Sequence, residues 1–152
     1  PKVGRPWMPG YGVPDDESGA MPWSWARERL ERCRNYLVAT TRPDGRPHVM
    51  PVWGLWHDER FCFSTAITSV KSRNLESNPA CALSIEDGHE SVVVEGMARL
   101  TPLEDVPGFT RAYEEKYGET IDEGPIWSVA PAVAFGFRED DTFSQTATRW
   151  EF

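Results

Sequence analysis

The stretch 35-NYLVATTRPDGRPHVMPVWGLWHDERFCFSTA-66 decides the fold, because it holds three extended segments separated by two turns. β-Branched and aromatic side chains are frequent in the three segments, which are residues 35–42, 46–56 and 61–66. Such residues favour strands, whereas the Pro-Asp-Gly and His-Asp-Glu-Arg sequences between them favour turns. Because both connections are short, the stretch predicts an antiparallel β-meander.

Pro51 lies inside the second of these segments and removes one hydrogen-bond donor from it. A proline within a strand predicts an edge strand, a bulge, or backbone that faces something other than a neighbouring strand. Trp53 and Trp56 are three residues apart, so we expect them to point to opposite faces. One of them is expected in the core or an interface, and the other at the border of a pocket.

The rest of the chain adds helices and further strands to the meander. Helical spacing and capping residues predict helices at residues 22–34, 68–79 and 103–117. Further strands are expected at residues 80–87, 91–100 and 131–139, with a possible seventh at 142–152. The sequence therefore predicts a mainly β domain at residues 22–152, a six- to seven-stranded antiparallel barrel, after an irregular arm at residues 1–21 that lies against the body.

Composition excludes several classes of partner and site. The chain has 152 residues, 24 acidic against 16 basic side chains, a formal charge of −8 and a pI near 4.9. This acidic balance argues against nucleic acid and anionic membranes as partners. No segment resembles a signal peptide or a run of about 20 apolar residues, so we expect a cytoplasmic protein. The three cysteines are an odd number without a Cys-x-x-Cys pair, which predicts reduced thiols. The three histidines do not pair at metal-ligand spacing, so we expect no metal site.

A small basic stretch, 64-STAITSVKSRNL-75, stands out in this acidic chain. Lys71 and Arg73 fall in the first turn of a predicted helix, where the helix dipole disfavours cations. A bound anion removes this conflict, because free N–H groups, the dipole and two cations then converge on it. Phosphate fits best, with hydroxyl donors from Ser64, Thr65, Thr68 and Ser69. The alternative is that both cations are solvated residues on a short surface helix.

Three segments together resemble the pyridoxamine-5′-phosphate-oxidase-like split-barrel superfamily. They are residues 39–56, residues 61–85 and residues 91–100. Within it, the PHVMPVWG run and the Thr-Arg-Trp ending are most similar to the B-type flavin/deazaflavin oxidoreductases. The resemblance implies the FMN-binding-split-barrel topology and a homodimer with two cofactor sites at the subunit interface.

The resemblance also implies the residues that hold the coenzyme. The backbone that faces the ring is that of Val49, Met50, Pro51 and Val52. The phosphate lies beside Ser64 and Thr65 and is held by Lys71, which is flanked by Ser72, Arg73 and Asn74. By the resemblance, Trp150 is a candidate to line the ring pocket. Trp127 is expected as a further pocket wall because it lies in the predicted loop at residues 119–129, not because of the resemblance.

Departures from the vitamin B6 oxidases bear on the coenzyme. Those oxidases read Ser-Arg-Lys where this chain reads Ser69-Val70-Lys71, and they have Gln where this chain has Ser91. Their C-terminal Arg-Leu-x-Pro is replaced by residues 149–152. These differences argue against pyridoxine phosphate oxidation and weaken the case for FMN. We therefore expect coenzyme F420, with FMN as the alternative.

No nucleophile or acid–base constellation is evident, which suits hydride transfer because the coenzyme carries the difficult step. We expect an F420-dependent oxidoreductase acting on a small unsaturated or quinone-like molecule, or else a non-catalytic binder of a cofactor or tetrapyrrole. Proton donors left open are Tyr117, His48 and water, although His48 and His57 are expected as surface or hydrogen-bonded residues. The anionic F420 tail has candidate partners in Arg42, Arg46 and Arg149. Substrate contacts are expected from residues 1–21 and 119–129.

Overall fold

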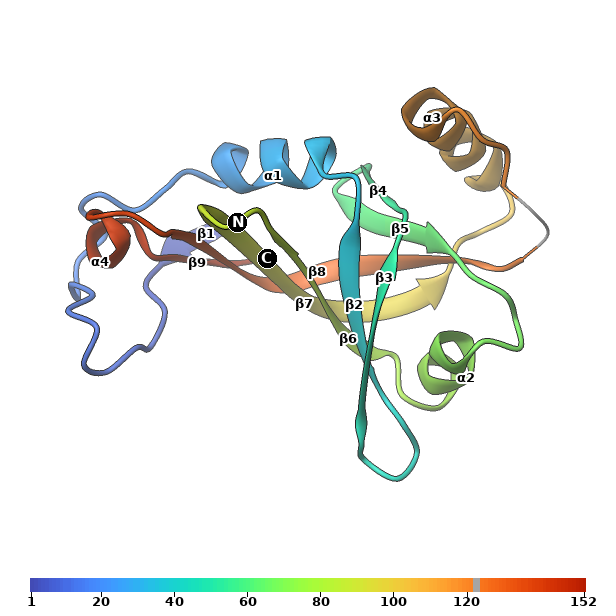
Figure 1. The fold of residues 1–152 in the computed structure, drawn as a ribbon, viewed down its shortest axis with the longest axis horizontal. Helices are drawn as coiled ribbons and strands as arrows, with labels where there is room; N and C mark the ends of the chain where they lie inside the picture. The colour runs from blue at the N-terminus through green and yellow to red at the C-terminus, as the bar shows by residue number, and fades with distance from the viewer. Residues whose placement is uncertain (122–123) are drawn as a thin grey trace.

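A computed structural model describes residues 1–121 and 124–152, and Figure 1 shows them as one curved sheet flanked by short helices. The elements follow in the order β1 (Lys2–Gly4), α1 (Trp23–Arg32), β2 (Tyr36–Thr41), β3 (Pro47–Val52), β4 (Leu55–His57), β5 (Arg60–Ser64), α2 (Val70–Ser77), β6 (Ala80–Glu86), β7 (Glu90–Leu100), α3 (Val106–Tyr117), β8 (Ile126–Arg138), α4 (Phe143–Thr146) and β9 (Thr148–Glu151).

All strand pairs are antiparallel, in the order β1-β9-β8-β7-β6-β2-β3. The long strand β8 pairs with two different strands, β5 and β9, along one of its edges. Its first residues pair with β5, from Ile126 opposite Ser64, and its later residues pair with β9, from Val133 opposite Glu151. β5 in turn pairs with β4, so the sheet divides at β8 and does not close. The predicted mainly β, split-barrel architecture is confirmed.

The described residues form nine strands where the sequence predicted six or seven. The predicted strand at residues 46–56 is two strands, because the chain bends at Trp53 and Gly54. Gly54 packs so closely on Phe61 that a Cβ atom there would lie 2.5 Å from the ring. At the C-terminal end, α4 precedes a short β9, so the strand predicted at 142–152 is shorter than expected.

The loop expected at residues 119–129 is shorter than predicted, because β8 already begins at Ile126. Trp127 consequently lies in a strand and is only 4 % exposed, so the prediction that it lines a pocket is wrong. Residues 122–123 of this loop lie outside the described residues. Substrate contacts from the rest of the loop stay a prediction.

The N-terminal arm is tied to the C-terminal end of the chain. Its first residues form β1, which pairs with β9, so the arm is not wholly irregular. The Arg5 guanidinium donates hydrogen bonds to the backbone oxygens of Asp16, Ser18, Gln145 and Ala147. The expectation that the arm lies against the body is confirmed.

Two apolar clusters hold the fold together. The larger cluster lies between α1 and the sheet, and its fully buried side chains include Leu30, Tyr36, Phe61 and Trp150. The smaller cluster lies beneath α3 and includes Phe109 and Tyr117. Trp56 is 7 % exposed and belongs to the core, whereas Trp53 is 36 % exposed and stacks on Tyr117 at a centroid distance of 4.7 Å. The two tryptophans therefore differ in environment as expected.

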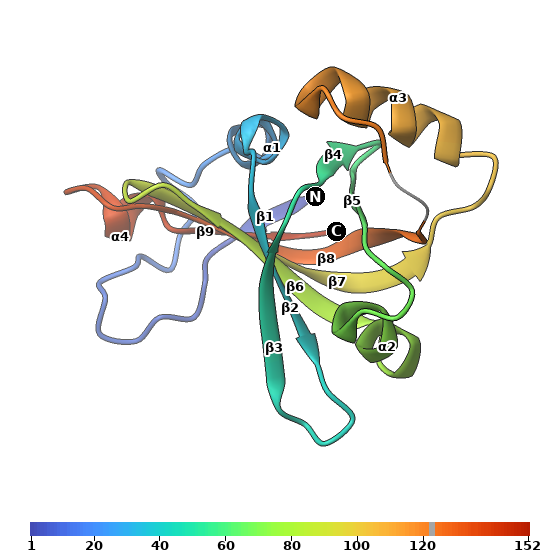
Figure 2. The same cartoon turned by 45° about the vertical axis from the view of Figure 1, so that its right-hand side comes forward.

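The β2–β3 hairpin projects from the rest of the sheet in both Figure 1 and Figure 2, with α2 beside it.

Cys33, Cys62 and Cys81 are free thiols. Across residues 1–121 and 124–152, no helix is long and apolar enough to cross a bilayer, and no cluster of His, Cys, Asp or Glu is arranged to hold a metal ion.

Candidate functional site

The start of α2 is built by hydroxyl groups, as the basic stretch predicted. Ser69 caps the helix, because its Oγ accepts a hydrogen bond of 3.1 Å from the backbone N–H of Ser72. The Thr65 hydroxyl donates to the same Oγ at 3.1 Å, and the Thr65 backbone N–H donates to the oxygen of Pro125. Ser64 ends β5 immediately before this loop. The loop from strand to helix is thus held in one conformation.

Two cations and free N–H groups meet at this helix end. Lys71 and Arg73 lie in the first turn of α2, and this first turn contains no acidic residue. Neither forms an ion pair within the described parts of the chain, and burial lowers the pKa of Lys71. The backbone N–H groups of Val70 and Lys71 also have no acceptor among the described residues. The arrangement therefore suits an anion such as phosphate.

Ser72 and Asn74 are not directed at this helix end. Both are buried, and their side chains attach α2 to the sheet. The Trp127 indole N–H donates to Ser72 Oγ at 3.2 Å, and Asn74 Nδ2 donates to Thr40 Oγ1 at 2.9 Å. The interpretation that these side chains contact phosphate is therefore replaced by a positioning role.

β3 is an edge strand that pairs with β2 alone among the described strands, as Pro51 predicted. Met50 is 46 % exposed and pairs with Val38. Alternation along β2 places Val38 on the same face as Thr40, to which α2 is bonded. Met50 thus faces the α2 side, where a ligand held by Lys71 would lie.

Of the other predicted ring-facing residues, Val52 shares that direction because it is two residues from Met50, whereas Val49 and Pro51 do not. Val49 is 53 % exposed and, with Pro51, lies on the opposite face of the strand, whereas Val52 is 9 % exposed and packs in the core. What the four residues share is the unpaired backbone edge of β3. A ring placed along this edge would meet their peptide groups, which agrees with the backbone role that the resemblance implies.

Trp150 does not line a pocket of this chain, so that prediction is wrong. Its side chain is fully buried, and its indole N–H donates to the backbone oxygen of Met21 at 3.2 Å. Gly136 leaves room for the ring, because a Cβ atom there would lie 2.6 Å from it. Burial alternates along β9, with Thr148 and Trp150 inside, and this alternation was the available sequence signal.

His48 is a residue whose place the sequence interpretation missed. It pairs with Thr40 across β2 and β3, is 8 % exposed, and its Nδ1 has no hydrogen-bond partner in the described structure. Burial, together with the nearby cations Arg42 and Lys71, lowers the pKa of His48. It is therefore neither a surface nor a hydrogen-bonded histidine. His57, by contrast, is partly exposed and lies 3.3 Å from the Asp58 carboxylate.

Tyr117, considered as a proton donor, holds backbone instead. Its hydroxyl accepts from the N–H of Gly54 at 3.0 Å and is 2.8 Å from the oxygens of both Gly54 and Arg34. Burial raises the pKa of Tyr117 to about 12. Lys116 Nζ donates to Gly54 O and to the Tyr36 hydroxyl, and burial lowers its pKa to about 8. The end of α3 thus fixes the segment that follows β3.

The three arginines expected for an anionic tail are not together. Arg42 lies near enough to His48 to affect its ionisation. Arg46 is engaged with Asp44 at 2.9 Å in the same hairpin. Arg149 pairs with Glu151 and lines a hollow with Trp7 of the arm, beside β9. Arg42 is therefore the cation best placed to extend the α2 site.

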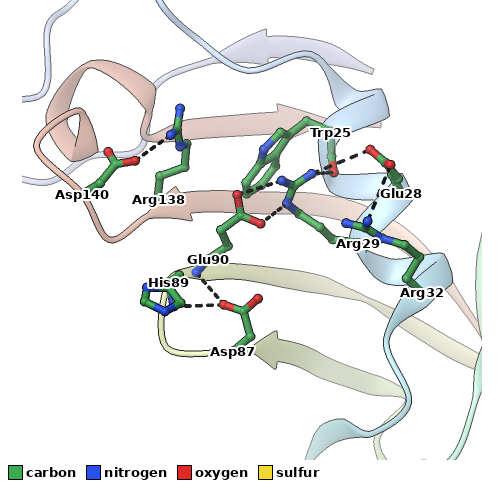
Figure 3. Close-up of polar contacts among 9 residues, drawn as sticks. All are labelled: Trp25, Glu28, Arg29, Arg32, Asp87, His89, Glu90, Arg138 and Asp140. Carbon is green, nitrogen blue, oxygen red and sulfur yellow. Dashed lines mark hydrogen bonds and ion pairs between the residues drawn. The ribbon is translucent and has the colours of Figure 1, made fainter.

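A separate hollow of about 260 Å³ lies between α1 and the turn joining β6 to β7. Figure 3 shows that its central cation is paired: Arg29 binds Glu90 through two hydrogen bonds of 2.6 and 2.7 Å. The same guanidinium stacks on Trp25 at 3.9 Å. Because Arg29 is already occupied, this hollow suits a coenzyme phosphate less well than the start of α2.

The divided sheet defines the class of split-barrel proteins. A family model described as pyridoxamine 5′-phosphate oxidase matches residues 25–148. The chain belongs to this family, which includes oxidoreductases. A search of curated proteins finds no match.

Solved structures give the same fold. A conserved hypothetical protein from Mycobacterium tuberculosis is 20% identical, with a TM-score of 0.70, covering 78% of this chain and 85% of that chain. An F420 reductase is 27% identical, with a TM-score of 0.60, covering 71% and 94%. The heme storage protein HutZ from Vibrio cholerae is 19% identical, with a TM-score of 0.62, covering 74% and 90%. The first and third show the fold alone.

Proposed function

We propose that the protein is an F420-dependent oxidoreductase, which transfers hydride between the deazaflavin coenzyme and a small unsaturated or quinone-like substrate. The observation that carries the proposal is the start of α2, where Lys71, Arg73 and two free N–H groups lie together on a helix that is bonded to β2, the neighbour of the open strand β3. The likeness to an F420 reductase supports the choice of coenzyme.

Each part of this site has a distinct task. Lys71 and Arg73 bind the coenzyme phosphate, with Ser64 and Thr65 beside it, while Ser72 and Asn74 hold α2 at the correct distance from the sheet. The backbone of β3 orients the ring, and Met50 covers it on the α2 side. The bound coenzyme supplies the hydride chemistry, so the chain needs no nucleophile of its own.

Coenzyme retention is the direct test. The protein is incubated separately with F420 and FMN, passed through gel filtration, and its absorption spectrum is measured. We expect F420 to be retained and its reduced form to be oxidised by members of a panel of quinones and enones. Retention of FMN alone would favour the FMN enzyme, which the same phosphate site allows. Binding without turnover, including binding of tetrapyrroles, would favour a carrier.

The proposal includes a homodimer with coenzyme sites at the subunit interface. The face of β2 and β3 that is turned away from α2 is apolar and uncovered: Leu37 and Val49 are 46 % and 53 % exposed. Met97 on β7, 53 % exposed, lines a hollow of about 470 Å³ that reaches β2. Exposed apolar surface of this extent is typical of interfaces, which supports a second copy of the chain here.

Leu37→Asp combined with Met97→Asp is expected to yield a monomer. Each new carboxylate would be buried at the interface without a partner charge, and the cost of its desolvation would disfavour association. Light scattering after gel filtration measures the mass. Leu103→Asp is the matched control, since Leu103 is 87 % exposed and lies before α3, away from this face. A dimer that persists in the double variant would place the interface elsewhere.

A cytoplasmic location is also part of the proposal. It is supported by the free thiols of Cys33, Cys62 and Cys81, because cysteines persist in the reduced form mainly in that compartment.

A further inference from the structure

His48 is a buried titratable group that the hydride-transfer proposal does not use. It is 8 % exposed, and its Nδ1 atom is enclosed without a hydrogen-bond partner in the described residues. Leaving a buried polar atom unpaired costs free energy. Trp56, Thr101 and Ser128 also carry such an atom, but His48 is the titratable residue among them, so a ligand or a change of ionisation state can explain its unpaired nitrogen.

The position of His48 connects it to the start of α2. Its cross-strand neighbour is Thr40, whose hydroxyl accepts the hydrogen bond from Asn74 of α2. The charged groups that shift its pKa are Arg42, after β2, and Lys71, in the first turn of α2. Asp44 at the tip of the same hairpin is engaged with Arg46. Burial and the cations Arg42 and Lys71 therefore lower the pKa of His48 and favour its neutral form.

We propose that a phosphate group bound at the start of α2 causes His48 to take up a proton, so that phosphate binding and protonation of His48 are coupled. Burial opposes a positive imidazole most, and the charges of Arg42 and Lys71 add to that opposition. The phosphate oxygens offset these two charges. Protonation also makes both ring nitrogens of His48 hydrogen-bond donors. Phosphate oxygens are negatively charged acceptors, which favour the protonated ring. The inference rests on the phosphate site of the proposed function, not on the ring chemistry.

The coupling has a defined sign. A group whose pKa is raised by a ligand takes up a proton as the ligand binds, and the ligand then binds more tightly at lower pH. Affinity is highest below the pKa of His48 in the free protein and falls as the pH rises to its pKa in the complex. Within that window, one proton taken up corresponds to about a tenfold loss of affinity per pH unit.

Histidine NMR tests the inference without any coenzyme. The chain has three histidines, so protein labelled with ¹³C-histidine gives three imidazole signals. Each pKa is measured in inorganic phosphate and in chloride of equal ionic strength. We expect phosphate to raise the pKa of His48 by about one unit or more, while His57 and His89 do not move. Single His57→Gln and His89→Gln variants, at positions that are not buried, assign the signals by elimination.

One double variant makes the result decisive. In Lys71→Ala/Arg73→Ala protein, the phosphate-induced rise should disappear, because the anion is no longer held beside His48. An equal pKa in phosphate and chloride would overturn the inference, as would a rise that survives the loss of both cations. A phosphate-induced rise in a protein that oxidises no reduced F420 would overturn the proposed function and leave this inference standing.

Discussion

Replacing Lys71 and Arg73 together by alanine is expected to weaken coenzyme binding by at least about tenfold. A hydrogen bond to a charged group contributes on the order of 1.5–3 kcal/mol, and about 1.4 kcal/mol corresponds to a factor of ten. Both side chains lie in the first turn of α2 without an ion-pair partner among the described residues. Titration of the protein with F420, followed by absorbance or calorimetry, measures the change.

The stability of the same variant separates a binding role from a structural one. Cations at a helix start are unfavourable by roughly 0.3–1 kcal/mol, so the coenzyme-free variant should be no less stable than the parent. Arg32→Ala/Arg111→Ala removes two exposed cations on other helices and serves as the charge-matched control. Unchanged F420 affinity in the Lys71/Arg73 variant would show that the two cations are ordinary surface residues.

Trp150→Ala is expected to lower the free energy of unfolding by about 3–5 kcal/mol, the range found for large-to-small changes in protein cores. The Trp150 ring is fully buried, lies 5.5 Å from the ring of Trp23, and donates its N–H to Met21. Its loss would leave a cavity and an unpaired carbonyl oxygen. Urea unfolding followed by circular dichroism measures the effect, and Trp150→Phe should recover much of the stability.

Trp7→Ala provides the comparison, because Trp7 is 89 % exposed and its removal should change stability by no more than about 0.5 kcal/mol. A pocket-lining Trp150 would behave differently from a core residue. In that case, the alanine variant would keep its stability and lose coenzyme affinity, which is the result that contradicts the structure.

Features that depend on local chemistry could be predicted from the sequence. The turn at Pro43-Asp44-Gly45, the edge position of Pro51 and the cap at Ser69 all depend on residues close to one another in the chain. The same is true of Gly118, which ends α3 with a positive φ of 71°. The basic character of the α2 start was visible for the same reason.

Features that depend on distant pairing were not visible. Trp150 is buried because the segment that begins α1, far away in the sequence, packs on this face of β9: Trp23 contacts its ring and Met21 accepts its N–H. Ser72 and Asn74 were placed at the phosphate by proximity to Lys71, but a helix turns by about 100° per residue and directs them to the sheet. The burial of His48 likewise depends on where α2 packs, which the sequence of β3 alone does not contain.

The open edge of β3 also bears on solubility. An unpaired strand edge is a template for strands of other molecules, and natural proteins protect such edges against aggregation with proline and charge. β3 contains Pro47 and Pro51, four residues apart, each of which lacks an N–H group. The edge can therefore stay open to a small molecule without pairing with a strand of another molecule. Replacing these prolines would be expected to promote aggregation through this edge.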